Sequence, residues 1–405
     1  MRISAVRGSL LALFFAFPAS AQSPLDQALA HWRRNEVDEA LPFFERAARE
    51  HRDDANTLAW LADAFRRLGR QADAVATARR ALDRQPCHAF AHGVVAASYN
   101  PQYGWWDQAN PDSTWQHLLR GVECDPNDGN LWIMVWTEAL RRRDGGREQE
   151  SIRRIHRAGF IAPAAMAFNR WVLRNLPLGA VLITNGDLDT YPALAAQLVE
   201  GLRTDVTVVN GSLLNAPWYA QLMAERYGFT LSVGPDQDGD YRTFTRPDGT
   251  EITPEDTLVH AWVAQAATGR FGRPLAALDS ATLGDGERIV LAGPAYLVLM
   301  PGDSMTDDTT ALRQAVQDLH GSEFRGPGVS SQDRSPLRQA SQDGLALRAL
   351  WTGLILGDRL LAHGDVAGAN AILEWAEVFM DEADLASDQA TTMLEDFRTE
   401  IESSP

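Results

Sequence analysis

The sequence predicts a protein of three parts: an N-terminal α-solenoid, a Rossmann-like α/β layer and a C-terminal helical pair. Small and apolar residues recur with a period of about 34 residues through the first part. The second part contains two apolar, β-branched runs, which a helix-like segment separates. A last amphipathic stretch contains one glycine turn. These patterns divide the chain into residues 24–160, 165–301, a linker region at 302–340, and 341–405.

An export signal is expected at residues 1–21. Arg2 and Arg7 precede the apolar run LLALFFAF, and Ala19-Ser20-Ala21 forms a small-residue cleavage site. The apolar run is too short to span a bilayer. No cysteine directly follows the cleavage site, which argues against a lipoprotein. The sequence therefore predicts a periplasmic or secreted protein with no membrane span in the mature chain.

The clearest repeat is ANTLAWLADAFRRLGRQADAVATARRALDRQPCH, residues 55–88. Gly69 marks the turn, and Ala62 and Ala74 are small enough to let two antiparallel helices approach closely. This pattern resembles the tetratricopeptide repeat family. Weaker copies precede it and follow it as far as residue 158. The resemblance implies stacked helical hairpins whose groove binds a partner protein or peptide.

An aromatic insertion, NPQYGWWDQANPDS, interrupts the third repeat. Aromatic rings beside a solenoid groove are suited to gripping a partner. The rings can instead fold back and fill the gap that the insertion creates, and both interpretations stay open here. The candidate partner-binding residues are Tyr103, Trp105, Trp106 and Trp115.

Cys87 and Cys124 each lie at the end of the second helix of a repeat. Equivalent ends of adjacent repeats are neighbours, so a disulfide is plausible in an oxidising compartment. An alternative adds His88, His92 and His117 as nitrogen ligands of a zinc ion.

The second part begins with the apolar runs GAVLITN, residues 179–185, and DVTVVNGSLL, residues 205–214. A helix-like segment joins them, and this crossover is long enough to make the two strands parallel. Ligands of such sheets bind beyond the carboxyl ends of the strands. The candidate ligand-binding residues there are Asn185, Gly186, Asp187, Asp189, Thr190, Asn215 and Trp218.

Asp187 and Asp189 have two interpretations. With a divalent metal, the one cofactor that this interpretation requires, they would hold the phosphates of a sugar or nucleotide. Alternatively, Asp189 or Thr190 caps the helix entered through Pro192, and Asp187 satisfies backbone donors in the turn. Trp218 is likewise either a pocket residue or part of the core.

Two blocks of this part, residues 183–219 and 273–301, resemble the soluble C-terminal region of the bacterial membrane proteins called DUF2723, relatives of protein O-mannosyltransferases. That resemblance implies an α/β domain combined with repeat-like helices. In that family sugar transfer is attributed to a multispanning membrane part, which this chain does not match. Leu188 also stands where the family usually has a polar residue. Glycosyl transfer is therefore not expected of this chain.

The charge balance limits the partners. The net charge is −17, and all 37 basic residues are arginine, which argues against nucleic acid and anionic lipid as partners. The absence of lysine excludes a Walker phosphate loop and Schiff-base chemistry. We therefore expect an exported scaffold or adaptor, without catalysis of its own, that binds a cell-envelope protein. The alternative is an α/β domain that binds, or acts on, a phosphorylated sugar or nucleotide.

Overall fold

The computed structural model describes residues 23–100, 107–231, 241–284, 288–302, 315–317, 319–325, 337–385 and 387–404, without the side chains of residues 337–343. The expected export signal lies outside the described residues, as do Tyr103, Trp105 and Trp106. The chain forms two compact units, residues 1–98 and 99–405. We describe each unit by itself.

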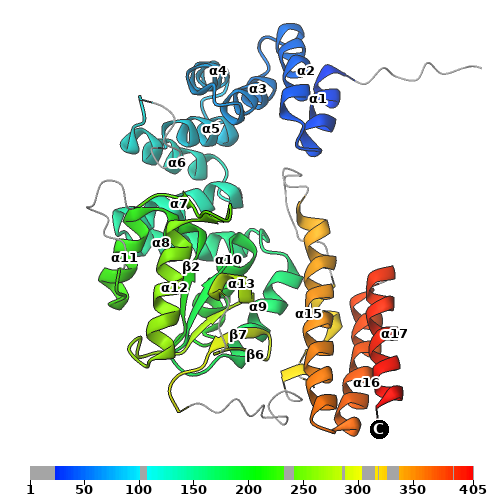
Figure 1. Cartoon of the computed structure of the whole chain (residues 1–405). Coiled ribbons are helices and arrows are strands. Elements are labelled where there is room, and N and C mark those ends of the chain that lie inside the picture. The colour runs from blue at the N-terminus through cyan, green and yellow to red at the C-terminus, as the bar shows by residue number, and fades with distance from the viewer. Residues whose placement is uncertain are drawn as a thin grey trace, which may run out of the picture. The chain divides into compact units, whose positions relative to one another are not determined.

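The first unit consists of consecutive helices (Figure 1): α1 Pro24–Arg33, α2 Val37–Glu50, α3 Ala55–Arg67, α4 Gln71–Arg84 and most of α5 Ala89–Tyr99. Helix α1 packs against α2, α2 against α3, and α3 against α4. Ala62 and Ala74 are fully buried, because only a methyl group fits where the helices approach most closely. Gly69 has a φ of +75°, in the left-handed region that favours glycine, at the short turn between α3 and α4.

The second unit starts with further helices: α6 Pro111–Cys124, α7 Gly129–Arg142, α8 Gly145–Arg157 and α9 Pro163–Asn175. Helices α7 and α8 form a close pair. Helix α8 packs against α10 Asp187–Glu200, and α7 contacts α11 Pro217–Tyr227. The division between compact units thus falls at residue 98, whereas the sequence pattern suggested a change of architecture near residue 160.

The sheet of the second unit has five strands in the order β2-β1-β5-β7-β6. Strand β1 is parallel to β2 and β5, and β7 is antiparallel to β5 and β6. The expectation that the first two strands are parallel is confirmed, but the sheet is small and mixed, and a Rossmann-like classification is not confirmed. The strands are β1 Val181–Thr184, β2 Thr207–Asn210, β5 Leu275–Ala277, β6 Ile289–Ala292 and β7 Ala295–Val298; β3 Phe244–Thr245 and β4 Glu251–Ile252 form a separate hairpin.

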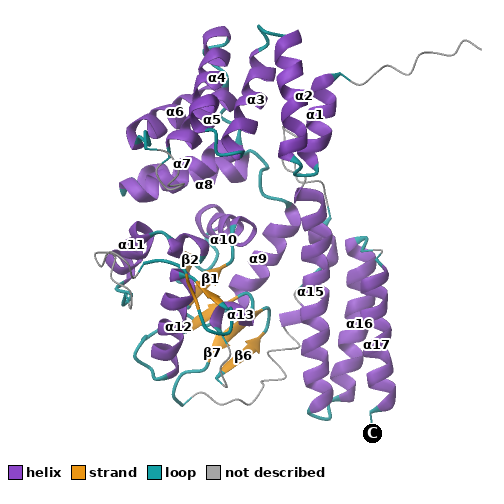
Figure 2. Ribbon diagram, turned by 45° about the horizontal axis from the view of Figure 1, so that its top comes forward, coloured by secondary structure: helices purple, strands orange, loops and turns teal. Residues whose placement is uncertain are grey.

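Short and long helices surround this sheet (Figure 2): α10, the 3-10 helix η2 Ser212–Asn215, α11, α12 Pro254–Ala267 and α13 Ser280–Leu283. All four residues of β1 are buried, so this strand lies at the centre of the core. On α9, Trp171 is fully buried and donates from Nε1 to the carbonyl oxygen of Ala315 at 2.5 Å.

The chain ends with the 3-10 helix η3 Gly321–Phe324 and the helices α15 Leu337–Ala362, α16 Val366–Ala383 and α17 Asp388–Ser403. Helix α15 packs against α9, α16 and α17. Gly364, with a φ of +76°, makes the turn between α15 and α16, and Ala369 and Ala376 are fully buried on α16. Among the described helices, none combines the length and the apolar character needed to cross a membrane.

Candidate functional site

Polar side chains gather at the carboxyl ends of the three parallel strands. Asn185 follows β1, and its Nδ2 donates to a carboxylate oxygen of Asp279, which follows β5. Thr282 donates to Asn185 Oδ1 at 3.1 Å, and Ser212, after β2, donates to the Asn185 carbonyl at 3.3 Å. Parallel strands bring their carboxyl ends to one edge of the sheet, which explains why residues nearly 100 positions apart meet here.

The first turn of α12 adds a second acidic side chain to this edge. Asn215 Nδ2 donates to Glu255 Oε2 at 3.1 Å, and the Glu255 backbone N–H donates back to Asn215 Oδ1 at 3.1 Å. Gly211 is needed beside this pair, because a Cβ there would lie 2.2 Å from Glu255 Oε1. Burial raises the pKa of Glu255, and the nearby carboxylates of Asp256 and Asp279 act in the same direction.

Glu255 and Asp279 were not among the residues that the sequence suggested. Asp279 carries a usable signal, because it follows the apolar run of β5 directly, as Asn185 follows β1. Glu255 has no such signal, since it belongs to a helix whose position against the sheet is set by tertiary packing.

The two aspartates of the Asp-x-Asp motif lie in the first turn of α10 and not in a loop. Gly186 is the N-cap residue, without a side-chain capping bond, and Pro192 lies inside the helix. The prediction that Asp189 or Thr190 caps a helix entered at Pro192 is therefore wrong. Negative charge in the first turn interacts favourably with the positive end of the helix dipole. The helix can therefore start at Asp187 without a side-chain cap.

Asp187 and Asp189 have different environments. Asp187 is exposed, whereas Asp189 is only 7% exposed. Burial raises the pKa of Asp189, opposed by the positive charge of Arg348 and by a hydrogen bond from the Asn185 backbone N–H. Asp189 therefore fastens the end of β1 to α10. Asp187 is the more exposed residue of the two, although partial burial of its carboxyl group also raises its pKa.

Thr190 belongs to a buried hydrogen-bond network. Its hydroxyl lies 2.6 Å from that of Thr184 on β1, and Asn210 Nδ2 on β2 donates to it at 3.1 Å. The Asn210 backbone N–H in turn donates to the Tyr219 hydroxyl at 3.0 Å. This network holds α10 and α11 against the sheet. Trp218 is half-buried, and its ring lies edge-on to Tyr219 at 5.7 Å.

No group of three or more histidine, cysteine, aspartate or glutamate residues among the described positions could hold a metal ion. A divalent cation near Asp187 would therefore have to take most of its ligands from water or from a substrate phosphate, as Mg²⁺ commonly does.

Aromatic side chains form a continuous series through the first unit. The rings of Trp32 and Trp60 lie 5.5 Å apart, those of Phe44 and Trp60 stack at 6.2 Å, and those of Trp60 and Phe90 meet at 4.7 Å. Trp32 and Phe44 are buried, whereas Trp60 and Phe90 are half-buried. We call Trp32, Phe44, Trp60 and Phe90 the aromatic series. The sequence pattern did not single these residues out, because single aromatic residues on helices are ordinary core residues.

In the second unit, Trp115 on α6 is half-buried, with the Arg142 guanidinium 5.3 Å from its ring centre. It is the one member of the expected partner-binding set that lies within the described residues.

Among the described residues, no cysteine is free, and both Cys87 and Cys124 are disulfide-bonded. Bonded sulfurs are not the thiolates that zinc requires, so the zinc interpretation lacks its sulfur ligands. His88 Nδ1 accepts from the Ala91 backbone N–H at 3.2 Å, and His92 Nε2 lies 3.0 Å from the Pro86 carbonyl oxygen. These contacts give both histidines a role in ending α4 and starting α5.

Two protein-family models match the chain. The model of the tetratricopeptide repeat matches residues 25–87, and the model described as TMEM260-associated domain 2 matches residues 165–230. No curated protein matches. A thermophilic TPR protein of Thermus thermophilus is a similar solved structure, with 20% identity over 32% of this chain and 70% of that chain and a TM-score of 0.30.

Residues 25–87 of the first unit thus match tetratricopeptide repeats, a class of helical hairpin that generally binds protein partners. The second matched stretch runs from α9 to α11 and includes Asn185, Ser212 and Asn215 of the polar edge of the sheet, but not Glu255, Asp279 or Thr282. The resemblance of that stretch to DUF2723 proteins stays a prediction.

Proposed function

We propose that this protein is an exported scaffold that binds a cell-envelope protein through its N-terminal repeats and has no catalytic activity of its own. The observation that carries this proposal is the aromatic series, of which Trp32, Phe44 and Trp60 lie within the matched repeats and Phe90 lies just after them. Two of its rings, Trp60 and Phe90, keep part of their surface open to solvent. Partly exposed aromatic rings on a rigid helical support are typical anchors of protein interfaces.

Arginine side chains lie over two aromatic rings of the first unit, of which Trp32 belongs to the aromatic series and Phe65 does not. The guanidinium groups of Arg67 and Arg70 each lie 4.2 Å from a ring centre, over Trp32 and Phe65 respectively. Residues 23–98 contain eleven arginines and eleven acidic residues, so the repeats are neutral although the whole chain has a net charge of −17. A partner would therefore be recognised by apolar anchors and individual polar contacts, and not by long-range charge attraction.

Site-directed photo-crosslinking tests the scaffold proposal. We place a benzophenone amino acid at Trp60 and, as the matched control, at Arg80, an exposed residue of the neighbouring helix α4. The expected result is one discrete adduct with an envelope protein from position 60, absent from position 80 and lost when Phe90 is replaced by alanine. Equal adducts from both positions, or none from position 60, would contradict the proposal.

Export is tested separately. Expression with the native N-terminus should yield a mature chain that begins at Gln22, recovered in the periplasm or medium and identified by its intact mass. An uncleaved chain in the cytoplasm would refute the export part of the proposal while leaving the repeat interface untouched.

A second candidate function is the binding of a phosphorylated sugar or nucleotide at the polar edge of the sheet, with a divalent metal. It is supported by the hydrogen bond between Asn185 and Asp279, two residues before the exposed Asp187, and by the pairing of Asn215 with Glu255, whose pKa Asp279 raises. Thermal unfolding against Mg²⁺, Mn²⁺, nucleotides and nucleotide sugars tests it, since ligand binding raises the melting temperature. Asp187→Asn is the informative variant, because Asp189 is a buried structural residue. A ligand-induced shift that Asp187→Asn leaves intact would exclude the metal-mediated mode.

A further inference from the structure

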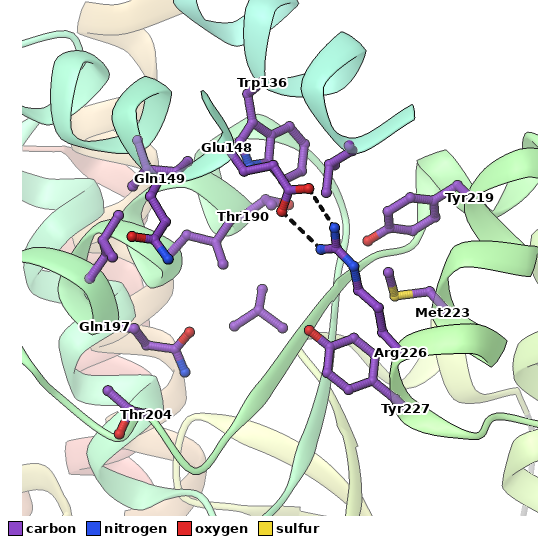
Figure 3. Close-up of a pocket in the computed structure, with 15 residues that line it drawn as sticks. Trp136, Glu148, Gln149, Thr190, Gln197, Thr204, Tyr219, Met223, Arg226 and Tyr227 are labelled. Carbon is purple, nitrogen blue, oxygen red and sulfur yellow. Dashed lines mark hydrogen bonds and ion pairs between the residues drawn. The ribbon is translucent and has the colours of Figure 1, made fainter. Parts of the chain in front are cut away.

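A cavity of ≈ 260 Å³ lies beside the edge strand β2, with residues of α7 and α8 above it and those of α10 and α11 on opposite sides of it (Figure 3). Its inner wall is formed by Trp136, Leu140, Ile152 and Met223, each at most 5% exposed. Its outer wall includes half-buried or exposed residues, among them Leu198. The cavity is therefore an apolar recess with an opening to solvent.

The Trp136 side chain in the wall of this recess is held in place by a residue outside the cavity lining. Tyr191, outside the lining, packs edge-on against the Trp136 indole at 5.3 Å and an interplanar angle of 80°. Met223 on α11 adds a flexible, polarisable thioether, a side chain that adapts well to flat rings. A fixed ring and an adaptable sulfur together suit an aromatic guest.

The charged groups at this cavity neutralise each other. Arg226 on α11 makes a bidentate ion pair with Glu148 on α8, with Nη1 to Oε2 at 2.8 Å and Nη2 to Oε1 at 2.5 Å. Both sides of the guanidinium fork are thereby used. A phosphate or carboxylate would have to break this pair to bind, so an uncharged guest is favoured.

The remaining polar groups of the cavity indicate which hydrogen-bonding group a bound molecule should have. Gln197 Nε2 donates to the carbonyl oxygens of Arg203 and Val206, both at 2.8 Å, which fixes the orientation of the carboxamide. Figure 3 shows this carboxamide on the α10 side, with the hydroxyl groups of Tyr219 and Tyr227 pointing inward from α11. The orientation of Gln197 leaves its Oε1 as a hydrogen-bond acceptor at the cavity wall.

We propose that this cavity binds an uncharged aromatic molecule of one or two rings that donates one hydrogen bond, with Gln197 Oε1 as the acceptor. The volume agrees with this class, because an apolar cavity of about 150 Å³ already admits benzene. The site is separate from both the aromatic series and the polar edge of the sheet. The guest would lie between the last two repeat-like helices and the sheet, and so would stabilise their mutual packing.

Methionine-methyl NMR of the full mature chain tests this proposal with indole as the probe. Indole has two rings and one N–H donor, and its ring current should shift the Met223 methyl resonance, which Met223→Leu identifies by its disappearance. We expect saturable binding with a dissociation constant on the order of 1 mM or below. Benzofuran, which replaces the N–H of indole by oxygen, should bind roughly threefold to tenfold more weakly, since one hydrogen bond is lost.

A matched pair of substitutions on α10 provides the control. Leu198→Trp fills the cavity and should weaken indole binding at least about tenfold, whereas Val199→Trp, on the neighbouring exposed residue, should leave it unchanged. Should Leu198→Trp unfold the protein, Thr204→Trp on the exposed rim replaces it. A Met223 resonance that indole does not shift, or binding that survives both cavity substitutions, would overturn the proposal. Equal affinity for benzofuran would overturn the role of Gln197.

Discussion

Arg226 and Glu148, 78 positions apart in the sequence, form a two-pronged ion pair that fastens α11 to α8. The Glu148 side chain is 13% exposed and that of Arg226 is 31% exposed, so the pair is partly shielded from solvent. Paired geometry and shielding both strengthen an ion pair relative to an open surface contact. This contact holds one wall of the cavity against the other.

We expect Glu148→Ala to lower the free energy of unfolding by about 1–2 kcal/mol, because it leaves the Arg226 guanidinium partly buried without its carboxylate. Urea unfolding followed by circular dichroism measures this change. The matched control is Glu225→Ala, which removes the partner of Arg143 in an ion pair whose side chains are 39% and 48% exposed. That control should change stability by less than about 0.5 kcal/mol. Equal losses in the two variants would show that shielding has no part in the effect.

The close packing around a glycine at the start of α7 leads to a second prediction about stability. A Cβ at Gly129 would lie 2.1 Å from the Phe160 ring, so Gly129→Ala forces that ring or the helix to move. We expect a loss of about 1–3 kcal/mol. Gly145→Ala, at the first residue of α8, meets nothing within 4 Å and is the control, expected to be neutral or stabilising by up to about 1 kcal/mol. Unchanged melting temperatures in both variants would contradict the tight packing of α7 on Phe160.

The sequence predicted the local features of this fold well and the tertiary features poorly. The period around Gly69 predicted the helical hairpin of α3 and α4, because small residues and a turn glycine are required wherever two helices approach closely. The crossover after Thr184 predicted a parallel strand pair, because a connection of that length is what two parallel strands require. The sequence pattern does not predict the antiparallel strand β7, since its pairing with β5 depends on tertiary packing that no local period encodes.

For the candidate site, too, the sequence predicted the local features better than the tertiary ones. Asn185 and Asp187 follow a strand, so their place at the carboxyl edge was predictable. Glu255 and the cavity residue Met223 lie on helices whose packing partners are distant in sequence, and nothing local distinguishes them from other helical residues. The sequence pattern places Pro192 in the first turn and therefore does not predict that α10 starts at Asp187, with Pro192 inside the helix.

The carboxyl groups of Asp358 on α15 and Glu400 on α17 predict a pH dependence. Burial raises the pKa of Asp358 to about 6, and repulsion from Glu400 and a hydrogen bond with it add to this effect. The folded state then holds a proton that the unfolded state releases at lower pH. This contribution to stability is complete below the ordinary aspartate pKa and is lost as the pH rises through about 6.

We therefore expect Asp358→Asn to raise the melting temperature at pH 7.5, where it removes a repelled charge, and to have little effect near pH 4. Asp396→Asn, on an exposed position of α17, is the control and should show no such difference between the two pH values. The same increase for Asp358→Asn at both pH values would exclude the titration of this carboxyl group as its cause.

The state of Cys87 and Cys124 makes the last prediction, since both are disulfide-bonded and the chain has no other cysteine. A bond between them would close a loop of roughly 37 residues, and the chain-entropy argument then gives about 4 kcal/mol of stabilisation, because the unfolded chain loses freedom. Intact mass after alkylation without reductant should therefore show no labelled thiol, and dithiothreitol should lower the melting temperature by several degrees. The Cys87→Ser, Cys124→Ser double variant should melt at the reduced temperature and be insensitive to dithiothreitol. A wild-type chain that takes up two alkyl groups without reductant would refute the bond, and a dimer that reductant dissolves would show that the sulfurs pair between chains.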